Sequence, residues 1–347
     1  MSLSFSEPSA DVAIERRSTP GTVVVCGVGS AGSRHVANLL ALGHEDLVLQ
    51  RTGLGASTRF PSDLACERDL ERALAGRPLA VVIANPTALH VPTALAAARA
   101  GAHLLIEKPL SHSLEGVGEL RREVERRGLL TLVGYQLRFH PSLQRVAAWI
   151  DGGALGEIVS AHAHWGECLR LWHPWEDYRN SYSARRELGG GALLTLSHPF
   201  DYLRLLLGEV RSVSAELGRR SGLEIDVEDV VQVSLQFANG VLGSVYLDYV
   251  TRPKRHFLEI VGRQGRLRWS EADATAELFD GHGVRVEVCR PPAGFERNTP
   301  YLDEMAHFLR CLSGKERPLC TLDDGIEALR ICRAALLSAE EGRRVAL

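Results

Sequence analysis

Lys108 and His198 are the two side chains of this sequence whose type and setting best suit chemistry at a C–O group. Lys108 stands between Glu107 and Pro109, directly after the apolar run HLLIE, and a lysine fixed before a proline could bind a hydroxyl whose oxygen becomes a carbonyl. His198 lies in the segment GGGALLTLSHPFDYLRLLLG, and imidazole has an ordinary pKa near neutrality, which suits proton exchange with that hydroxyl. A solvated cation and a packed core histidine are the simpler interpretations of these two residues.

Polar residues around His198 recur at intervals of three or four, the spacing of one helix face. Residues three and four apart share one face of a helix, so we expect one helix over about 190–207 that carries Thr195, His198, Asp201 and Tyr202 as a stripe. Thr195 stands where a carboxylate would be the natural partner of the histidine. A threonine can hydrogen-bond, but it holds no negative charge that would raise the pKa of His198. We therefore expect Asp201 to take over part of that role.

A glycine motif near the N-terminus predicts a dinucleotide site. Residues 27–32 read GVGSAG, a GxGxxG that follows a valine-rich strand and opens a helix, which is the context that the motif requires. The first glycine permits the tight turn, the second lets the backbone approach a pyrophosphate, and the N–H groups of the helix start attract the phosphates. We predict cofactor contacts from Gly27, Gly29, Ser30, Ala31 and Gly32.

The end of the second predicted strand bears on the choice between NAD and NADP. An acidic residue there would bind the ribose 2′-hydroxyl, whereas an arginine accommodates a 2′-phosphate. The chain has Gln50-Arg51-Thr52 and no acid before Asp63. We therefore interpret Arg51 and Thr52 as 2′-phosphate contacts and favour NADP, with NAD possible. A solvated surface arginine is the alternative.

Polar residues at the ends of the next two predicted strands complete the cofactor site. Asn85, Thr87 and His90 follow the third strand, and Glu107 and Lys108 come at the end of the fourth. Ligands of doubly wound sheets bind at this carboxyl edge, so these five side chains could line the nicotinamide.

Arg138, Trp175 and Tyr178 are the candidate substrate contacts outside these motifs. Aromatic faces beside charged groups suit the apolar ring faces and many hydroxyls of a sugar-like ligand, although ordinary packing around a loop explains them equally well. His162 and His164 alternate on one strand face without further ligands at a recognisable spacing, so we predict no metal site.

The order of the elements predicts an α/β protein in two parts. Over residues 21–140, continuous apolar strands alternate with helices, which is typical of a Rossmann-type doubly wound parallel sheet that binds NAD(P). Over residues 141–347, runs such as VVQVSLQF and FLEIVG alternate with period two, and helices are expected over 299–313 and 322–341. This second part predicts an α/β substrate domain with an open, mostly antiparallel sheet. Residues 1–20 are polar and are expected to form a disordered tail.

Composition argues against several classes of partner. The 347-residue chain has a formal net charge of -3, which does not favour nucleic acid or an anionic membrane, and its apolar runs are too short to span a bilayer. The seven cysteines are dispersed without a CxxC pair, so we expect reduced thiols and a cytoplasmic location.

Taken together, the motifs resemble the glucose–fructose oxidoreductase/inositol dehydrogenase (Gfo/Idh/MocA) family, through GVGSAG, NPTALH, EKP, GYQLRFHP, GGGALLTLSHPFD and the closing DDGIEALRICRAALLSAEEGRRV. The resemblance runs from about residue 22 to the C-terminus, and HPWEDYRNSYSARRELGGG is similar to a subgroup of sugar or nucleotide-sugar dehydrogenases. It implies hydride transfer at a sugar or cyclitol carbon, Lys108 at the reacting hydroxyl and His198 as the proton-transfer residue. It also implies a cis peptide before Pro109 and a homodimer or homotetramer formed through the C-terminal sheet.

One departure from the family motif leaves two functions open. The motif has an aspartate four residues before the histidine, and here Thr195 stands three before it. The first function is an NAD(P)-dependent oxidoreductase acting on CH–OH groups of a sugar, nucleotide sugar or cyclitol. The second is a cofactor-binding regulatory or partner-binding protein of the same fold. The joint presence of Lys108 and His198 favours the enzyme, since a sensor would need neither.

Overall fold

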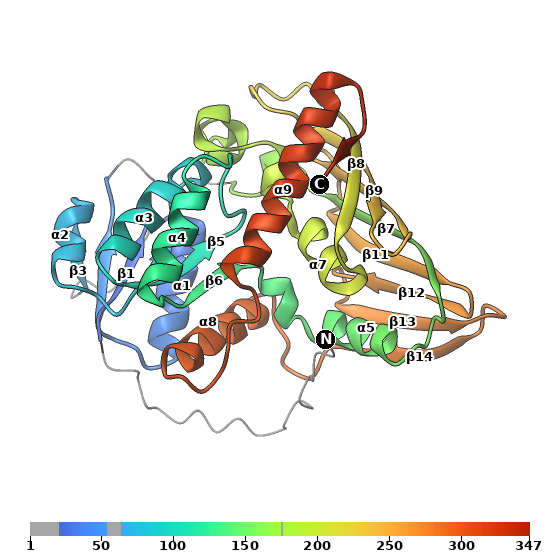
Figure 1. The fold of residues 1–347 in the computed structure, drawn as a ribbon, viewed down its shortest axis with the longest axis horizontal. Helices are drawn as coiled ribbons and strands as arrows, with labels where there is room; N and C mark the ends of the chain where they lie inside the picture. Colours follow the sequence, from blue (N-terminus) through green and yellow to red (C-terminus); the bar gives the residue numbers. More distant parts are fainter. Residues whose placement is uncertain (1–20, 54–63, 175) are drawn as a thin grey trace.

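The computed structural model describes residues 21–53, 64–174 and 176–347. The expected tail over 1–20 and the candidate Trp175 therefore lie outside the described residues. Two sheets organise the chain, with helices between them (Figure 1).

The first sheet is a six-stranded parallel Rossmann-type sheet, as the sequence predicts. Its strands are apolar and almost all fully buried because helices cover both faces. Its strand order is β3-β2-β1-β4-β5-β6. Strands β2 and β3 lie on one side of β1 and strands β4 to β6 on the other, so the strand order reverses between β1 and β4. The strand β3 was not expected, because its sequence ACE is short and lacks an apolar run. The bounds are β1 (Val23–Cys26), β2 (Leu47–Gln50), β3 (Ala65–Glu67), β4 (Ala80–Ile83), β5 (His103–Glu107) and β6 (Thr131–Gly134), with helices α1 (Ser30–Ala41), α2 (Leu70–Ala75), α3 (His90–Arg99) and α4 (Val117–Arg127).

The second sheet is mostly antiparallel, as predicted, with nine strands in the order β14-β13-β12-β11-β7-β10-β9-β8-β15. One pair, β7 with β10, is parallel. The sequence did not predict β8, β13 or the short C-terminal strand β15. The bounds are β7 (Ile158–Gly166), β8 (Val210–Gly218), β9 (Val230–Phe237), β10 (Leu242–Asp248), β11 (Arg255–Gly262), β12 (Gly265–Ser270), β13 (Thr275–Asp280), β14 (Arg285–Cys289) and β15 (Val345–Ala346).

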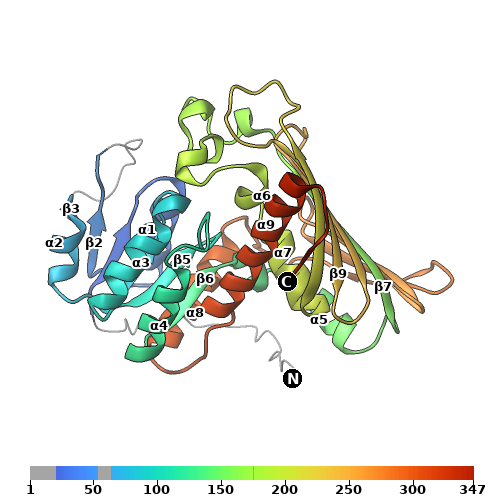
Figure 2. The same ribbon diagram turned by 45° about the horizontal axis from the view of Figure 1, so that its top comes forward.

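Helices cover only one face of this second sheet. Figure 2 shows α5 (Pro141–Asp151), α7 (His198–Leu207) and α9 (Leu322–Glu341) on the face that looks toward the first sheet. The opposite face carries no helix of the described chain (Figure 2). An antiparallel sheet can leave one face open in this way, whereas the parallel sheet is buried on both.

The helix α8 (Thr299–Leu312) lies late in the sequence but packs on the first sheet (Figure 1). Its buried Met305 and Phe308 join the core cluster that contains Val23, Val25 and Leu105. Asn298, just before the helix, donates from Nδ2 to Oδ1 of Asn38 in α1 at 2.8 Å. The Rossmann core is therefore completed by residues from the other end of the chain.

The expected single helix over 190–207 is broken into α6 (Ala192–Thr195) and α7 (His198–Leu207). Pro199 causes the break. A proline has no backbone N–H, so it cannot donate to the carbonyl four residues earlier, and it is tolerated only in the first turn of a helix. That carbonyl belongs to Thr195. The predicted stripe that joined Thr195 to His198 and Asp201 on one helix is therefore wrong.

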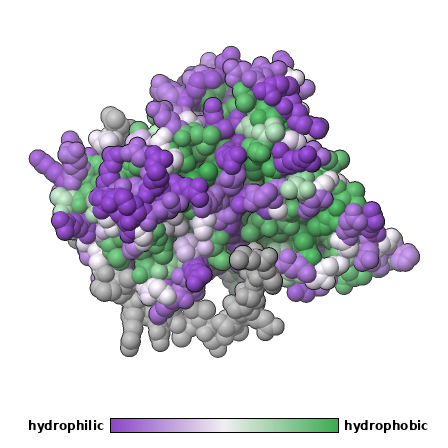
Figure 3. Space-filling view, viewed as in Figure 1, coloured by the Kyte–Doolittle hydropathy of each residue, from purple (hydrophilic) through white to green (hydrophobic). Residues whose placement is uncertain are grey.

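The outer helices follow their sequence patterns. Figure 3 shows hydrophilic side chains over α4, whose sequence VGELRREVERR buries only Val117, Leu120 and Val124.

Among the described residues, no helix combines the length and the apolar composition that a bilayer crossing requires.

Candidate active site

Lys108 links the edge of the first sheet to the helices of the second part. It follows β5, its peptide bond to Pro109 is cis as expected, and its Nζ donates to the main-chain oxygen of Thr195 at 2.7 Å. This is the carbonyl that Pro199 leaves free. Burial lowers the pKa of Lys108, and the charge of Glu107 opposes that shift. The Lys108 ammonium is thus held by the uncharged carbonyl of Thr195, and its other N–H groups are left to donate to a ligand.

Glu107 forms the layer behind Lys108. Its Oε1 accepts from or shares a proton with Nε2 of His35 at 2.8 Å, and its Oε2 accepts from the main-chain N–H of Lys108 at 3.2 Å. Burial would raise the pKa of Glu107, but the hydrogen bond and charge of His35 hold it below its ordinary value. A charged Glu107 therefore fixes the backbone from which Lys108 projects.

His198 is almost fully enclosed, with 1% of its surface exposed. Its ring lies 5.4 Å from the Tyr135 ring and 5.3 Å from the Trp165 ring. Within the described chain, neither nitrogen of His198 nor Nε1 of Trp165 has a hydrogen-bond partner. Burial lowers the pKa of His198 well below its ordinary value, and the charge of Lys108 adds to this. The imidazole is therefore a neutral group whose two nitrogens have no partner in the described chain.

The glycine turn before α1 fits a pyrophosphate. Gly29 is the N-cap of α1 and no side chain caps the helix, so the N–H groups of Ser30 and Ala31 lie in an open first turn. A Cβ added at Gly29 would meet nothing within 4 Å, which leaves the space that a bound phosphate needs. Gly27 and Gly32 differ, because a side chain at either would collide with backbone.

The residues after β4 hold one another in place beside this turn. His90 is buried, and its two ring nitrogens lie 2.9 Å from the main-chain oxygens of Pro109 and Asn85. Asn85 donates from Nδ2 to Thr93 at 2.8 Å, and its Oδ1 is buried without a partner in the described residues. Thr87 is buried. His90 therefore ties the β4 loop to the loop that carries Lys108.

Arg51 and Thr52 follow β2 at the same edge of the sheet. The main-chain N–H of Arg51 donates to the Glu67 oxygen at 3.0 Å, so the position of Arg51 is set by β3. Arg51 is half-buried and Thr52 is exposed. Both are placed where a ribose 2′-substituent binds in doubly wound folds.

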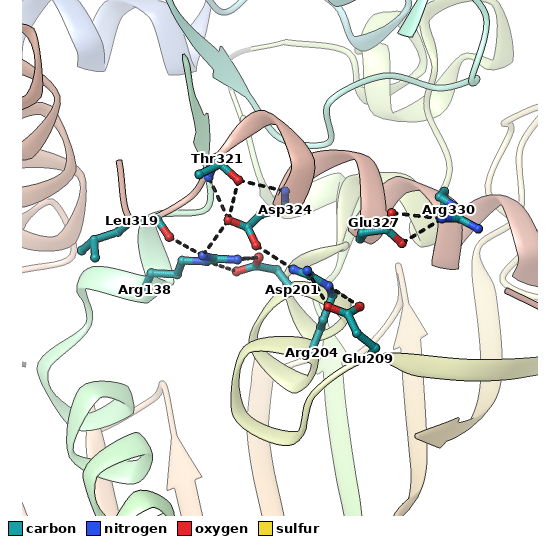
Figure 4. Close-up of polar contacts among 9 residues, drawn as sticks. All are labelled: Arg138, Asp201, Arg204, Glu209, Leu319, Thr321, Asp324, Glu327 and Arg330. Atoms are coloured by element: carbon teal, nitrogen blue, oxygen red, sulfur yellow. Dashed lines mark hydrogen bonds and ion pairs between the residues drawn. The ribbon is translucent and has the colours of Figure 1, made fainter. Parts of the chain in front are cut away.

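The expectations for Arg138 and Asp201 need correction. The two side chains face each other, with Nη2 of Arg138 on Oδ1 of Asp201 at 2.6 Å and Nε on Oδ2 at 3.0 Å (Figure 4). Both are buried, and Arg138 also contacts Asp324 at the start of α9, which pairs with Arg204 at 2.7 Å. Arg138 is therefore a structural ion partner and not a substrate contact. Asp201 does not orient His198, because both of its oxygens are engaged by Arg138.

Tyr178 lies within the loop that precedes α6. Its hydroxyl accepts from the main-chain N–H of Glu224 at 3.3 Å, and the guanidinium of Arg170 lies 5.4 Å from its ring. These contacts hold the loop together and do not bring Tyr178 to Lys108 or His198.

Several residues that contact the site were not predicted: His35, Tyr135, Trp165, Lys254 and His256. Trp165 could have been found, because Ala161, Ala163 and Trp165 alternate with polar residues along β7 and must face inward. The others are brought in by tertiary structure and carry no local signal.

One trio of described residues could in principle hold a metal ion: His307, Cys311 and Glu316. Nδ1 of His307 lies 2.5 Å from Glu316, and Nε2 accepts from the Leu319 N–H at 3.0 Å. Burial raises the pKa of Cys311 to about 12, so its thiol stays protonated. Both ring nitrogens of His307 are thus engaged by other groups of the chain.

Comparison with known proteins places the chain among oxidoreductases. Residues 22–135 match the model of the oxidoreductase family with an NAD-binding Rossmann fold, and residues 143–268 match that of the GFO/IDH/MocA C-terminal domain. An uncharacterised oxidoreductase of Synechocystis sp. is 33% identical over 271 residues, covering 71% of this chain and 70% of its own. The D-apiose dehydrogenase of Paraburkholderia graminis is 28% identical, covering 81% and 76%.

A solved structure of levoglucosan dehydrogenase in complex with NADH has the same fold. It superposes with a TM-score of 0.82 over 94% of this chain and 98% of its own, at 21% sequence identity.

The glycine turn yields a paired prediction. Gly29→Ala should leave the free energy of unfolding within ~1 kcal/mol of wild type, since the new methyl meets nothing, but should weaken nicotinamide binding at least tenfold. Gly32→Ala should destabilise the fold itself, because its methyl would collide with the Gly27 oxygen. Urea unfolding and fluorescence titration with the cofactor measure the two effects. Unimpaired binding by Gly29→Ala would show that the phosphates lie elsewhere.

The buried ion pair yields a second prediction. Arg138→Met or Asp201→Asn should each cost ~3–5 kcal/mol of unfolding free energy, because the remaining charge or polar group is left buried without its partner. The double variant should be more stable than the sum of the two losses predicts. Chemical denaturation of the four proteins measures this coupling. Strict additivity would contradict the pairing.

Proposed function

Because the chain belongs to the Gfo/Idh/MocA family of oxidoreductases, we propose that it is a nicotinamide-dependent enzyme that transfers a hydride to or from a sugar, nucleotide-sugar or cyclitol carbon. The observation that carries this proposal is the meeting of Lys108 and His198 at the edge of the dinucleotide-binding sheet. Lys108 contacts Thr195, three residues from His198, and both basic groups contact Trp165.

The open hydrogen-bonding groups of the site support a polyhydroxy substrate. Nε1 of Trp165 and both nitrogens of His198 are buried without partners in the described chain, and burying polar atoms this way is costly unless a ligand satisfies them. A hydroxylated ring offers several donors and acceptors at once. The curated relatives that act on such compounds, D-apiose dehydrogenase among them, support the same substrate class.

The site residues divide the work of the reaction. Lys108 directs an N–H at the oxygen of the reacting carbon, and neutral His198 takes up the hydroxyl proton in oxidation or returns it in reduction. The bound nicotinamide supplies the hydride acceptor or donor, held by Gly27, Gly29, Ser30, Ala31 and Gly32, with Asn85, Thr87 and His90 along the adjacent edge. Thr195 replaces the family's aspartate, yet its carbonyl still anchors Lys108.

We propose NADP as the preferred cofactor, with Arg51 and Thr52 at the 2′-phosphate. Wild type should then bind NADPH more tightly than NADH, and Arg51→Ala should weaken NADPH binding about tenfold while leaving NADH binding nearly unchanged, since only the phosphate contact is lost. Quenching of tryptophan fluorescence measures both affinities. Arg263→Ala, an exposed arginine of the second part, is the matched control. Equal binding of both cofactors would overturn the NADP preference alone.

Turnover of NADPH with a panel of keto-sugars and cyclitol ketones tests the reaction itself. Lys108→Ala should lower the turnover of any accepted substrate by ~100-fold or more while changing the NADPH affinity little. If neither cofactor binds, the redox proposal falls, and a regulatory or partner-binding role for the same fold takes its place.

We further propose that the open face of the second sheet joins two copies of the chain, as a homodimer or half of a homotetramer. Leu242 at 60% and Val261 at 36% exposed lie on this face beside His162 and Ser244. Light scattering should give at least twice the chain mass, and Leu242→Glu with Val261→Glu should shift it toward the monomer. A wild-type monomer would refute this assembly.

We also propose a cellular location and a division of the chain into two parts. All seven cysteines are free in the structure, which supports a reducing, cytoplasmic location. The division at residue 140 into a cofactor-binding and a substrate-binding part is proposed on the same footing.

A further inference from the structure

Lys254 is a second ammonium group at the site that the proposed function does not use. Its Nζ lies 5.6 Å from the centroid of the Trp165 ring, and Nζ of Lys108 lies 5.9 Å from the same centroid. Lys254 is held in place by Glu271, at 2.8 Å, and by Glu167, at 3.5 Å. Trp165 in turn is stacked on His256, with the ring centroids 4.5 Å apart and the planes at 4°. Both ammonium groups therefore lie beside one indole ring.

The basic residues beside Trp165 are lysines, whereas most basic residues of the chain are arginines. Of the 40 lysines and arginines, only three are lysines: Lys108, Lys254 and Lys315. Lys108 and Lys254 both contact Trp165. Apart from Lys315, the remaining residues of this set are arginines. A lysine can release its proton when it is buried near another cation, whereas an arginine cannot. The composition thus places the chain's rare titratable cations together at the reaction site.

The charges around Lys108 come from several elements. Glu107 and Glu167 attract its proton, and Arg34 and Lys254 repel it. Glu107 is already bonded to His35, and Glu167 lies beside Lys254. The contact on the helix side is the uncharged Thr195 carbonyl, and the imidazoles of His198 and His90, which interact with Lys108, are buried, with pKa values lowered by burial. Lys254 is the one of these cations that shares a ring contact with Lys108.

We propose that Lys254 is a positioning residue for Lys108: across the indole that they share, its charge favours the neutral amine of Lys108. This rests on the proposed function for its consequence. In alcohol oxidation the substrate O–H bond breaks and its proton forms an N–H bond on Nζ, while the hydride passes from carbon to the nicotinamide. Neutral Lys108 is then an alternative acceptor to His198 for the single proton of the reacting hydroxyl.

The scarcity of lysine makes a direct test possible. Full-length protein labelled with [ε-13C]lysine gives three lysine signals, and Lys254→Gln and Lys315→Gln each remove and so assign one. Titration into the alkaline range by NMR then measures the pKa of Lys108 without substrate or cofactor. At an effective dielectric of ~20, a unit charge about 10 Å away changes a pKa by roughly one pH unit.

We expect Lys254→Gln to raise the pKa of Lys108 by up to roughly one pH unit, since Glu271 and Glu167 offset part of the charge of Lys254. Lys254→Arg keeps the charge and should leave the pKa near its wild-type value, and the exposed control Lys315→Gln should leave it unchanged. A pKa of Lys108 that does not move in Lys254→Gln, or that moves equally in Lys315→Gln, overturns the proposal.

A second variant covers the case in which Lys254→Gln does not fold. Glu271→Gln removes a carboxylate that offsets Lys254, so it should lower the pKa of Lys108, in the opposite direction. No change there also overturns the proposal. Because these titrations use neither cofactor nor substrate, a shifted pKa in a protein that binds no nicotinamide would refute the oxidoreductase while leaving the lysine pair in place.

Discussion

The hydrogen bond from Lys108 to the carbonyl of Thr195 is the contact on which the arrangement of the site depends. It exists because Pro199 has no N–H to give to that carbonyl, which a continuous helix would have used. The same proline ends α6 and starts α7 at His198. Pro199 therefore has two effects: it leaves a carbonyl free to accept from Lys108, and it places His198 at the start of α7. Without the break, the lysine would face an occupied carbonyl.

A network of buried and half-buried ion pairs joins the two parts of the chain, and the reactive groups stand apart from this network. Arg138 and Asp201 bond in two places, and Asp324 adds Arg204 to the same network (Figure 4). Lys108 and His198 have no carboxylate bonded to their side chains in the described structure. Paired buried charges fix geometry, while unpaired basic groups keep their protons exchangeable. The junction thus provides rigidity, and the site retains reactivity.

Much of this arrangement could be predicted from local patterns in the sequence. The strand, GxGxxG and helix at 22–42 fold as expected because each feature is decided within a few residues. The break after Thr195 was also visible as a proline, but helical spacing across 190–207 was given more weight than the missing N–H. The partnership of Arg138 with Asp201 could not be predicted in the same way, since 63 residues separate them and either could have faced a ligand. Trp165 and Lys254 meet only because β11 pairs with β7.

The replacement of the family's aspartate by Thr195 has a physical consequence for the lysine. A carboxylate beside Lys108 would hold it in place and also stabilise its positive charge by a charge-assisted hydrogen bond. A backbone carbonyl holds it in place with a dipole and stabilises the charge far less. The position of Nζ is thus kept, and the burial of Lys108 disfavours its charged form. The loss of the acid therefore does not by itself mean a loss of chemistry, because the lysine is still held in place by the Thr195 carbonyl.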